Sequence, residues 1–261
     1  MSDEPTSDEP TSDEPTTFLI GGGWQPEHRD AVYGPFLAAA GSHPTIGCVV
    51  LDEGDGAEQF DRWALVLEAT ASCTPVPVLV PLGGVLDVGA LAGVDGMLVC
   101  GGLTPAYAAA LAPAATGLRS VLTGRGIPYA GFSAGASIAA RRALVGGWLD
   151  RGVPICSEDA GEDLAEMTVT EGLGLLPVTV DVHAAQWGTI ARLIAAVAAG
   201  LVNSGVAIDE NTLLAVGSGG AKVRGAGQVH WVRRAETAVL VTGFRAGALP
   251  HEVLPDEVLT G

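Results

Sequence analysis

Residues 131–136, GFSAGA, decide the fold that this chain can adopt. An apolar run over residues 127–130 precedes them and is typical of a buried strand, while residues 137–144 suit a helix. A serine between two glycines at a strand-to-helix turn has the pattern of a nucleophile elbow, a sharp turn that lifts a hydroxyl out of a sheet. Side chains two positions before and after Ser133 would collide with neighbouring elements, and both positions are glycine. In a chain with 37 glycines the same pattern can also arise from packing alone, so its context has to decide.

The context is an alternation of strand-like and helix-like stretches. The strand-like apolar runs cover residues 18–20, 46–51, 76–82, 96–100 and 127–130, and the helix-like stretches cover 31–40, 58–71, 85–91 and 105–126. This alternation predicts βαβ units and a mostly parallel sheet with helices on both faces, which makes an α/β three-layer sandwich. Glycine-rich turns follow several of the strands, at the edge where parallel sheets bind ligands. The turn over 21–23 lacks the spacing of a nucleotide-binding loop, so we expect it to be structural or to line the site.

The second half of the chain changes character. An acidic stretch over 146–171 is typical of a long surface loop, residues 178–183 suit a strand that ends at His183, and 187–202 suit an amphipathic helix. Short strand-like runs then predict a terminal antiparallel meander, over 206–208, 212–216, 221–223, 228–232 and 238–241. We therefore predict one domain over 17–261.

Composition limits the partners of this domain. The chain has 261 residues, 48% of them hydrophobic, and a net charge of −17, which argues against binding to nucleic acid or to an anionic membrane. Residues 2–16 are three copies of SDEPT, and we expect residues 1–16 to form a disordered acidic tail. The four cysteines have no paired or metal-ligand spacing, and no secretory signal or membrane-length apolar run is visible. These features favour a cytoplasmic protein with reduced cysteines and no metal site.

A serine hydroxyl needs a base, and His183 is the histidine expected at the end of a core strand. A carboxylate should then orient the imidazole. We predict Asp150 for this role and Glu158 as the second choice, both within the acidic stretch between Ser133 and His183; the other reading is that this stretch is simply a solvated loop. The 50 residues between serine and histidine leave too little room for the additional sheet and cap of an α/β-hydrolase.

Two backbone amides are candidates for an oxyanion hole, the pair of donors that stabilises a negatively charged carbonyl oxygen. Ala134 lies at the expected helix N-terminus directly after the serine. Gly102 follows a neighbouring strand and, without a side chain, lets a ligand come close.

Taken together, the motifs resemble the S51 peptidase family of dipeptidase E- and cyanophycinase-like enzymes. The matching stretches occur in the family's order and are residues 19–23, 101–102, 131–136, 172–177, 181–183 and 205–212. The resemblance implies a flavodoxin-like sheet similar to that of class I glutamine amidotransferases, Ser133 as nucleophile, His183 as base, and the glycine pair in the oxyanion hole. An acid in the loop after the elbow helix is compatible with Asp150. Family members need no cofactor and cleave peptide bonds next to acidic residues.

Substrate recognition differs from the family pattern. Leu103 stands where the family usually has Asn, whereas Arg192 remains in the following helix. We predict that Leu103, Asp181 and Arg192 contact the substrate.

The sequence thus predicts a serine-type peptidase that cleaves a small peptide or amide, with an aspartyl dipeptide as one candidate. Serine in place of cysteine at the elbow argues against glutamine amide transfer. The alternatives are a non-catalytic module that binds an amino-acid-like ligand on the same scaffold, and an esterase. The sequence leaves a homodimer open.

Overall fold

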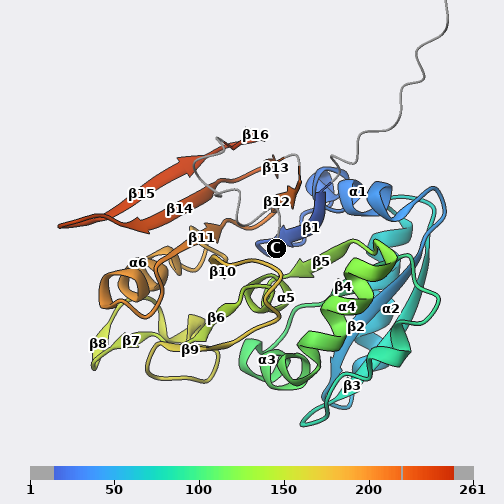
Figure 1. Ribbon diagram of the computed structural model, residues 1–261, viewed down its shortest axis with the longest axis horizontal. Coiled ribbons are helices and arrows are strands. Elements are labelled where there is room, and N and C mark those ends of the chain that lie inside the picture. Colours follow the sequence, from blue (N-terminus) through green and yellow to red (C-terminus); the bar gives the residue numbers. More distant parts are fainter. Residues whose placement is uncertain (1–14, 219, 250–261) are drawn as a thin grey trace, which may run out of the picture.

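An eight-stranded sheet forms the centre of the protein in a computed structural model that describes residues 15–218 and 220–249 (Figure 1). Its strands in chain order are β1 (Pro15–Ile20), β2 (Thr45–Asp52), β3 (Thr74–Pro81), β4 (Gly96–Val99), β5 (Tyr129–Phe132), β12 (Thr212–Gly217), β13 (Gly220–Gly225) and β16 (Gly247–Ala248). They lie in the order β16-β13-β12-β1-β5-β4-β2-β3. The five strands from β1 to β3 in this order are parallel, and β12, β13 and β16 extend the sheet with antiparallel pairs. The predicted mostly parallel, flavodoxin-like sheet is confirmed.

Helices cover both faces of this sheet. One face carries α1 (Arg29–Ala40) and α2 (Gly56–Glu68), and the other carries α3 (Thr104–Leu111), α4 (Ala115–Arg125) and α5 (Ala134–Ile138). Alternation along the strands explains the two layers, since Cys48 and Val50 pack with α1 and α2 while Val49 packs with α3 and α4. The predicted three-layer sandwich is therefore confirmed.

Several predicted helices are shorter than expected, and of the predicted helix over 85–91 only Val88–Leu91 is helical, as a 3₁₀ turn. Residues 105–126 divide into α3, a 3₁₀ turn and α4, because Pro113 lacks the amide proton that a continuous helix needs. The helix after Ser133 ends at Ile138 rather than continuing to 144, because the carbonyls of residues 138–140 accept hydrogen bonds from 173–175. Tertiary pairing here overrides the helix propensity of an alanine-rich stretch. The four 3₁₀ turns are η1 (Pro26–His28), η2 (Val88–Leu91), η3 (Ala112–Ala114) and η4 (Glu158–Ala160).

A second sheet stands beside the first and contains β10 (Thr179–Val182), β11 (Ser204–Ile208), β14 (Val229–Arg234) and β15 (Val239–Phe244) (Figure 1). Helix α6 (Ile190–Ala199) covers it, with Leu193 and Val197 packed against Ala207 and Val232. The antiparallel pairing predicted for the C-terminal strands is confirmed, but the strands are divided between the two sheets. The turn after β11 carries the chain from the second sheet into β12, beside β1.

The predicted acidic loop over 146–171 contains short strand pairs. They are β6 (Arg142–Gly146) with β9 (Thr168–Glu171), and β7 (Leu149–Asp150) with β8 (Val153–Pro154). Of the predicted acidic tail, residues 1–14 lie outside the described part of the chain, and Pro15 and Thr16 belong to β1. Across residues 15–218 and 220–249, every helix is too short or too polar to cross a membrane.

Candidate active site

Ser133 occupies the sharp turn between β5 and α5, as the sequence predicts. Its backbone has φ 51° and ψ −110°, a strained conformation for a residue with a side chain. A Cβ atom on Gly131 would lie 2.3 Å from the carbonyl oxygen of Gly135, and one on Gly135 would lie 2.3 Å from that of Val99. Glycine at both positions is therefore a requirement of the turn, and Ser133 has the sharp strand-to-helix geometry that was expected there.

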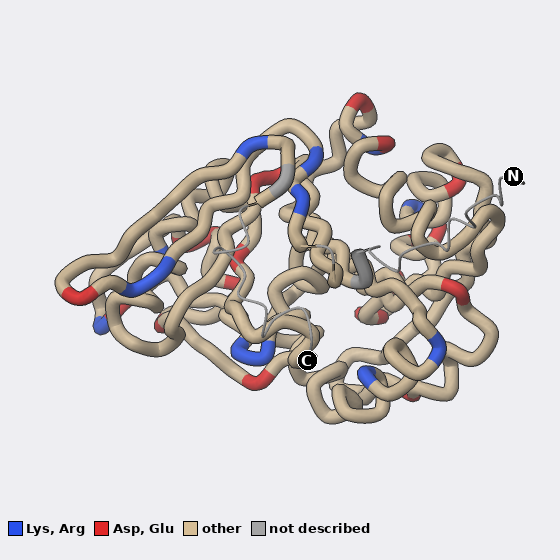
Figure 2. Tube along the Cα trace, turned by 45° about the horizontal axis from the view of Figure 1, so that its top comes forward, with Lys and Arg blue, Asp and Glu red and all other residues tan. Residues whose placement is uncertain are grey.

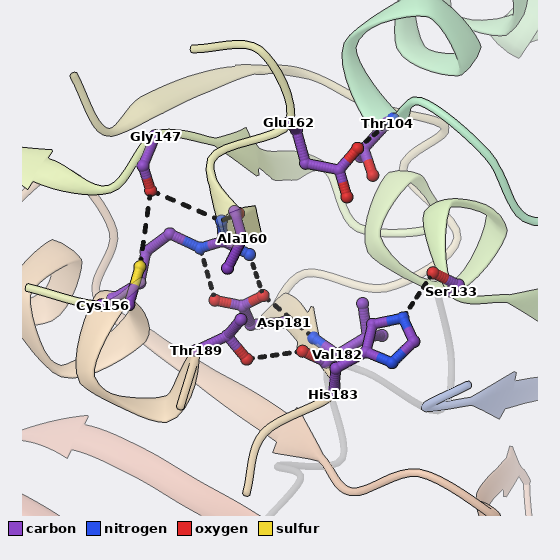
Figure 3. Close-up of polar contacts among 11 residues, drawn as sticks. Thr104, Ser133, Gly147, Cys156, Ala160, Glu162, Asp181, Val182, His183 and Thr189 are labelled. Atoms are coloured by element: carbon purple, nitrogen blue, oxygen red, sulfur yellow. Dashed lines mark hydrogen bonds and ion pairs between the residues drawn. The ribbon is translucent and has the colours of Figure 1, made fainter. Parts of the chain in front are cut away.

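His183 directly follows β10 and reaches Ser133 from the other sheet. Its Nε2 lies 2.8 Å from the Oγ atom of Ser133 (Figure 3). Both side chains are largely buried, and both line the same cavity. The structure thus brings together the predicted nucleophile and the predicted base from segments 50 residues apart.

Glu210 is the carboxylate that the structure places on the other side of the imidazole. Its Oε1 lies 2.8 Å from Nδ1 of His183, so Nδ1–H donates to Glu210 and Nε2 is left to accept from the Ser133 hydroxyl. Among the described carboxylates, Glu210 alone is hydrogen-bonded to His183. The order along the chain is therefore serine, histidine, acid.

This geometry corrects the prediction for the third group. Asp150 lies in β7 and is paired with the exposed guanidinium of Arg151, and Glu158 lies in η4 at the cavity wall. Both predicted carboxylates lie between Ser133 and His183 in the chain, whereas Glu210 comes 27 residues after the histidine. The signal was present in the stretch 205–212, a strand followed by Asp-Glu-Asn, which suits a second strand end at the same edge.

The end of β1 fixes the relative positions of these three segments. The carbonyls of Ile20, Gly21 and Gly22 accept hydrogen bonds, in that order, from the amides of Ser133 (2.9 Å), His183 (2.9 Å) and Asn211 (2.7 Å). A Cβ atom on Gly22 would lie 2.1 Å from Cε1 of His183. The turn over 21–23 is therefore a structural support of the site, as predicted.

Burial lowers the pKa of His183, and the hydrogen bond and charge of Glu210 raise it, with a net lowering. A lowered pKa keeps the imidazole neutral at neutral pH. In that state Nε2 has the lone pair that a general base needs.

The two predicted oxyanion donors lie close to the serine. Ala134 is the first residue of α5, and a Cβ on the neighbouring Gly101 would lie 3.3 Å from that of Ser133, which places the glycine pair beside the elbow. Within the part of the chain that the structure describes, the amides of Gly102 and Ala134 donate to no acceptor.

A cavity of about 1140 Å³ opens over the serine and histidine. Leu103 is part of its wall, as predicted for a residue that contacts substrate. Aromatic rings and carboxylates dominate the remaining wall, and these are Trp24, Trp63, Tyr107, Phe132, Trp148 and Trp187, with Glu53, Asp55, Glu158, Asp159, Glu162 and Asp163. Burial raises the pKa of Glu162, although its carboxylate accepts a hydrogen bond from the amide of Thr104.

Asp181 and Arg192, predicted to contact substrate, bind each other away from the cavity wall. Oδ1 of Asp181 lies 2.7 Å from Nη2 of Arg192, and Oδ2 lies 3.0 Å from Nε. The guanidinium also donates to the carbonyl of Ala160 at 2.6 Å, which ties the loop around η4 to the second sheet. This corrects the prediction, because both groups are almost fully buried and already paired.

We expect Arg192→Met to lower the free energy of unfolding by about 3–5 kcal/mol, because it leaves the Asp181 carboxylate buried without a charged partner and with only the hydrogen bond from the Val182 amide. Urea denaturation measures the change. Arg151→Met is the matched control, since the Arg151 side chain is 86% exposed and water and salt screen its pair with Asp150, which should change the stability little. Equal losses of unfolding free energy in the two variants would show that the buried pair stabilises the fold no more than the exposed pair.

Comparisons with known proteins found similarity among solved structures. No family model matches the chain, and no curated protein matches it. Among solved structures, the chain is similar to a protein from Listeria monocytogenes EGD-e that carries the provisional name peptidase E, with 13% sequence identity and a TM-score of 0.43. That match covers 87% of this chain and 98% of the other chain.

Proposed function

We propose that this protein is a serine-type hydrolase that cleaves a small peptide or amide through an acyl-enzyme. The observation that carries the proposal is the continuous hydrogen-bonded series from Ser133 through His183 to Glu210, with 2.8 Å at each step. A nucleophile, a base and a carboxylate that orients the base are the groups that acyl transfer needs.

In the proposed reaction, Oγ of Ser133 attacks the substrate carbonyl carbon as its proton passes to Nε2 of His183. Glu210 stabilises the imidazolium through Nδ1–H, and the amides of Gly102 and Ala134 stabilise the oxyanion. The C–N bond then breaks, and the leaving amine takes the proton from Nε2. Water attacks the resulting ester with His183 again as base, which releases the acid and restores the serine.

Labelling with a fluorophosphonate tests the proposal, because such probes react with an activated serine. We expect wild-type protein to gain one adduct, located on Ser133 by peptide mass spectrometry. Absence of labelling in folded protein, together with ligand-induced stabilisation and no turnover of a dipeptide panel, would support a non-catalytic binding module instead. Turnover of acyl esters without turnover of amides would support an esterase.

The charge of the cavity wall predicts the charge of the substrate. The described wall has six carboxylates and one cationic side chain, Arg62, whose guanidinium lies 5.6 Å from the centre of the Trp24 ring. Figure 2 shows lysines and arginines at separate places along the trace, alone or as adjacent pairs. A cavity lined by one sign of charge concentrates ligands of the opposite sign, so this wall favours a cationic or neutral substrate over the acidic ones of the family that the sequence resembles.

We expect kcat/KM for an amide of lysine to exceed that for the same amide of aspartate by at least about 10-fold, and the ratio to fall as salt is added. Two aminoacyl p-nitroanilides with the same leaving group provide the measurement. A preference for aspartate would contradict the electrostatic argument while leaving the serine mechanism intact.

A further inference from the structure

Trp187 lies against the proposed base and has no place in the mechanism above. Its ring is stacked on the imidazole of His183, with 3.9 Å between ring centres and 8° between ring planes. Its backbone amide also donates to the carbonyl of His183 at 2.9 Å, so the turn that follows β10 folds back over its own first residue. The indole is 43% exposed and belongs to the cavity wall.

The other contacts of the His183 imidazole are made by atoms at the edge of the ring. Nε2 faces Ser133, Nδ1 faces Glu210, and Gly22 lies against Cε1. These contacts fix where the ring atoms point. The stacked indole of Trp187 supports a face of the ring, and so opposes rotation of the imidazole out of the line between serine and carboxylate.

The stack also favours one charge state of the base. The face of an indole carries partial negative charge and attracts a cation above it. Around His183, burial opposes the imidazolium, the carboxylates of Glu210 and Asp181 favour it, and Arg192 opposes it. An indole face also favours the imidazolium, and it does so without placing another titratable group beside the ring.

We propose that Trp187 is a positioning residue of the proposed hydrolase, which holds the imidazole of His183 in line between Ser133 and Glu210 and stabilises the imidazolium that forms when the serine attacks. This inference rests on the proposed function for its effect on rate, whereas the stacking itself can be tested without any activity.

The stacking is tested by tryptophan fluorescence as a function of pH, because a protonated imidazole in contact with an indole quenches its emission. We expect wild-type emission to fall as His183 becomes protonated, with a single step that is absent from both Trp187→Phe and His183→Gln. Trp148→Phe is the matched control and should keep the step, since Trp148 shares the cavity wall but does not stack on the histidine. Persistence of the step in Trp187→Phe would overturn the proposal.

The effect on reactivity is tested by the rate of fluorophosphonate labelling across pH. Trp187→Leu should label roughly 3- to 10-fold more slowly than wild type at the optimum. Its acid limb should move to lower pH, because loss of the indole lowers the pKa of His183 and the neutral base then persists further into acid. Trp187→Phe should recover most of the rate, since a phenyl ring can stack in the same place.

The outcomes separate this inference from the proposed function. If wild type were not labelled but showed the fluorescence step, the proposed hydrolase function would be refuted. The proposed effect of Trp187 on the reaction rate would be refuted with it, while the stacking would stand. Labelling of wild type and of Trp187→Leu at the same rate with the same pH profile would overturn the positioning role alone.

Discussion

Ser133→Ala is expected to abolish fluorophosphonate labelling and to lower the kcat of amide hydrolysis by at least about 10³-fold. The alanine retains the elbow but has no oxygen to attack the carbonyl, so only binding and the oxyanion donors remain. The residual rate, measured under saturating substrate, reports what those donors contribute without the nucleophile.

Ser137→Ala is the control for this variant. Ser137 lies in α5, the short helix that follows Ser133, and is also buried, but it does not line the cavity. It should label and turn over substrate like the wild type. If Ser137→Ala lost labelling and Ser133→Ala kept it, the nucleophile would be Ser137 and the assignment to Ser133 would be wrong.

Glu210→Gln is expected to lower kcat by about 10²- to 10⁴-fold, because an amide neither stabilises the imidazolium nor secures the tautomer with a proton on Nδ1. The carboxylate is 24% exposed and is bonded to His183 at 2.8 Å, so its replacement by an isosteric amide should preserve the fold. Single-turnover labelling rates and steady-state kcat provide two independent measurements.

Asp150→Asn and Glu158→Gln are the matched comparisons for Glu210→Gln. Asp150 forms its ion pair with Arg151, and Glu158 lies at the cavity wall without a hydrogen bond to His183 in the described structure. Asp150→Asn should therefore retain the wild-type kcat. A large loss in Asp150→Asn with little change in Glu210→Gln would restore the assignment that the sequence suggested.

Sequence reasoning located the parts of the site that local patterns specify. The glycines around Ser133 follow from steric crowding within one turn. A histidine at the end of an apolar strand can be recognised from the few residues before it. Glu210 could not be placed in the same way, because its proximity to His183 depends on the parallel pairing of β10 with β11. That pairing joins segments separated by a helix, so the local pattern over 205–212 puts Glu210 at a strand end without showing which strand lies beside it.

Charged residues were harder to interpret than glycines. Asp181 lies on the strand that leads to His183, and Arg192 lies on the next helix, so both were reasonable candidates for substrate contact. The deciding quantity was burial, since each is almost fully inaccessible and satisfied by the other. A sequence gives the sign of a charge but not whether a partner has already neutralised it.

The three successive carbonyls at the end of β1 have a consequence for motion. Because Ile20, Gly21 and Gly22 accept from the amides of Ser133, His183 and Asn211, no one of these segments can separate from the others without breaking a hydrogen bond to the same short strand end. Local opening of such shared backbone contacts is cooperative. We therefore expect the segments that carry nucleophile, base and acid to open together as one unit that spans two sheets, with similar hydrogen-exchange protection of the Ser133, His183 and Asn211 amides.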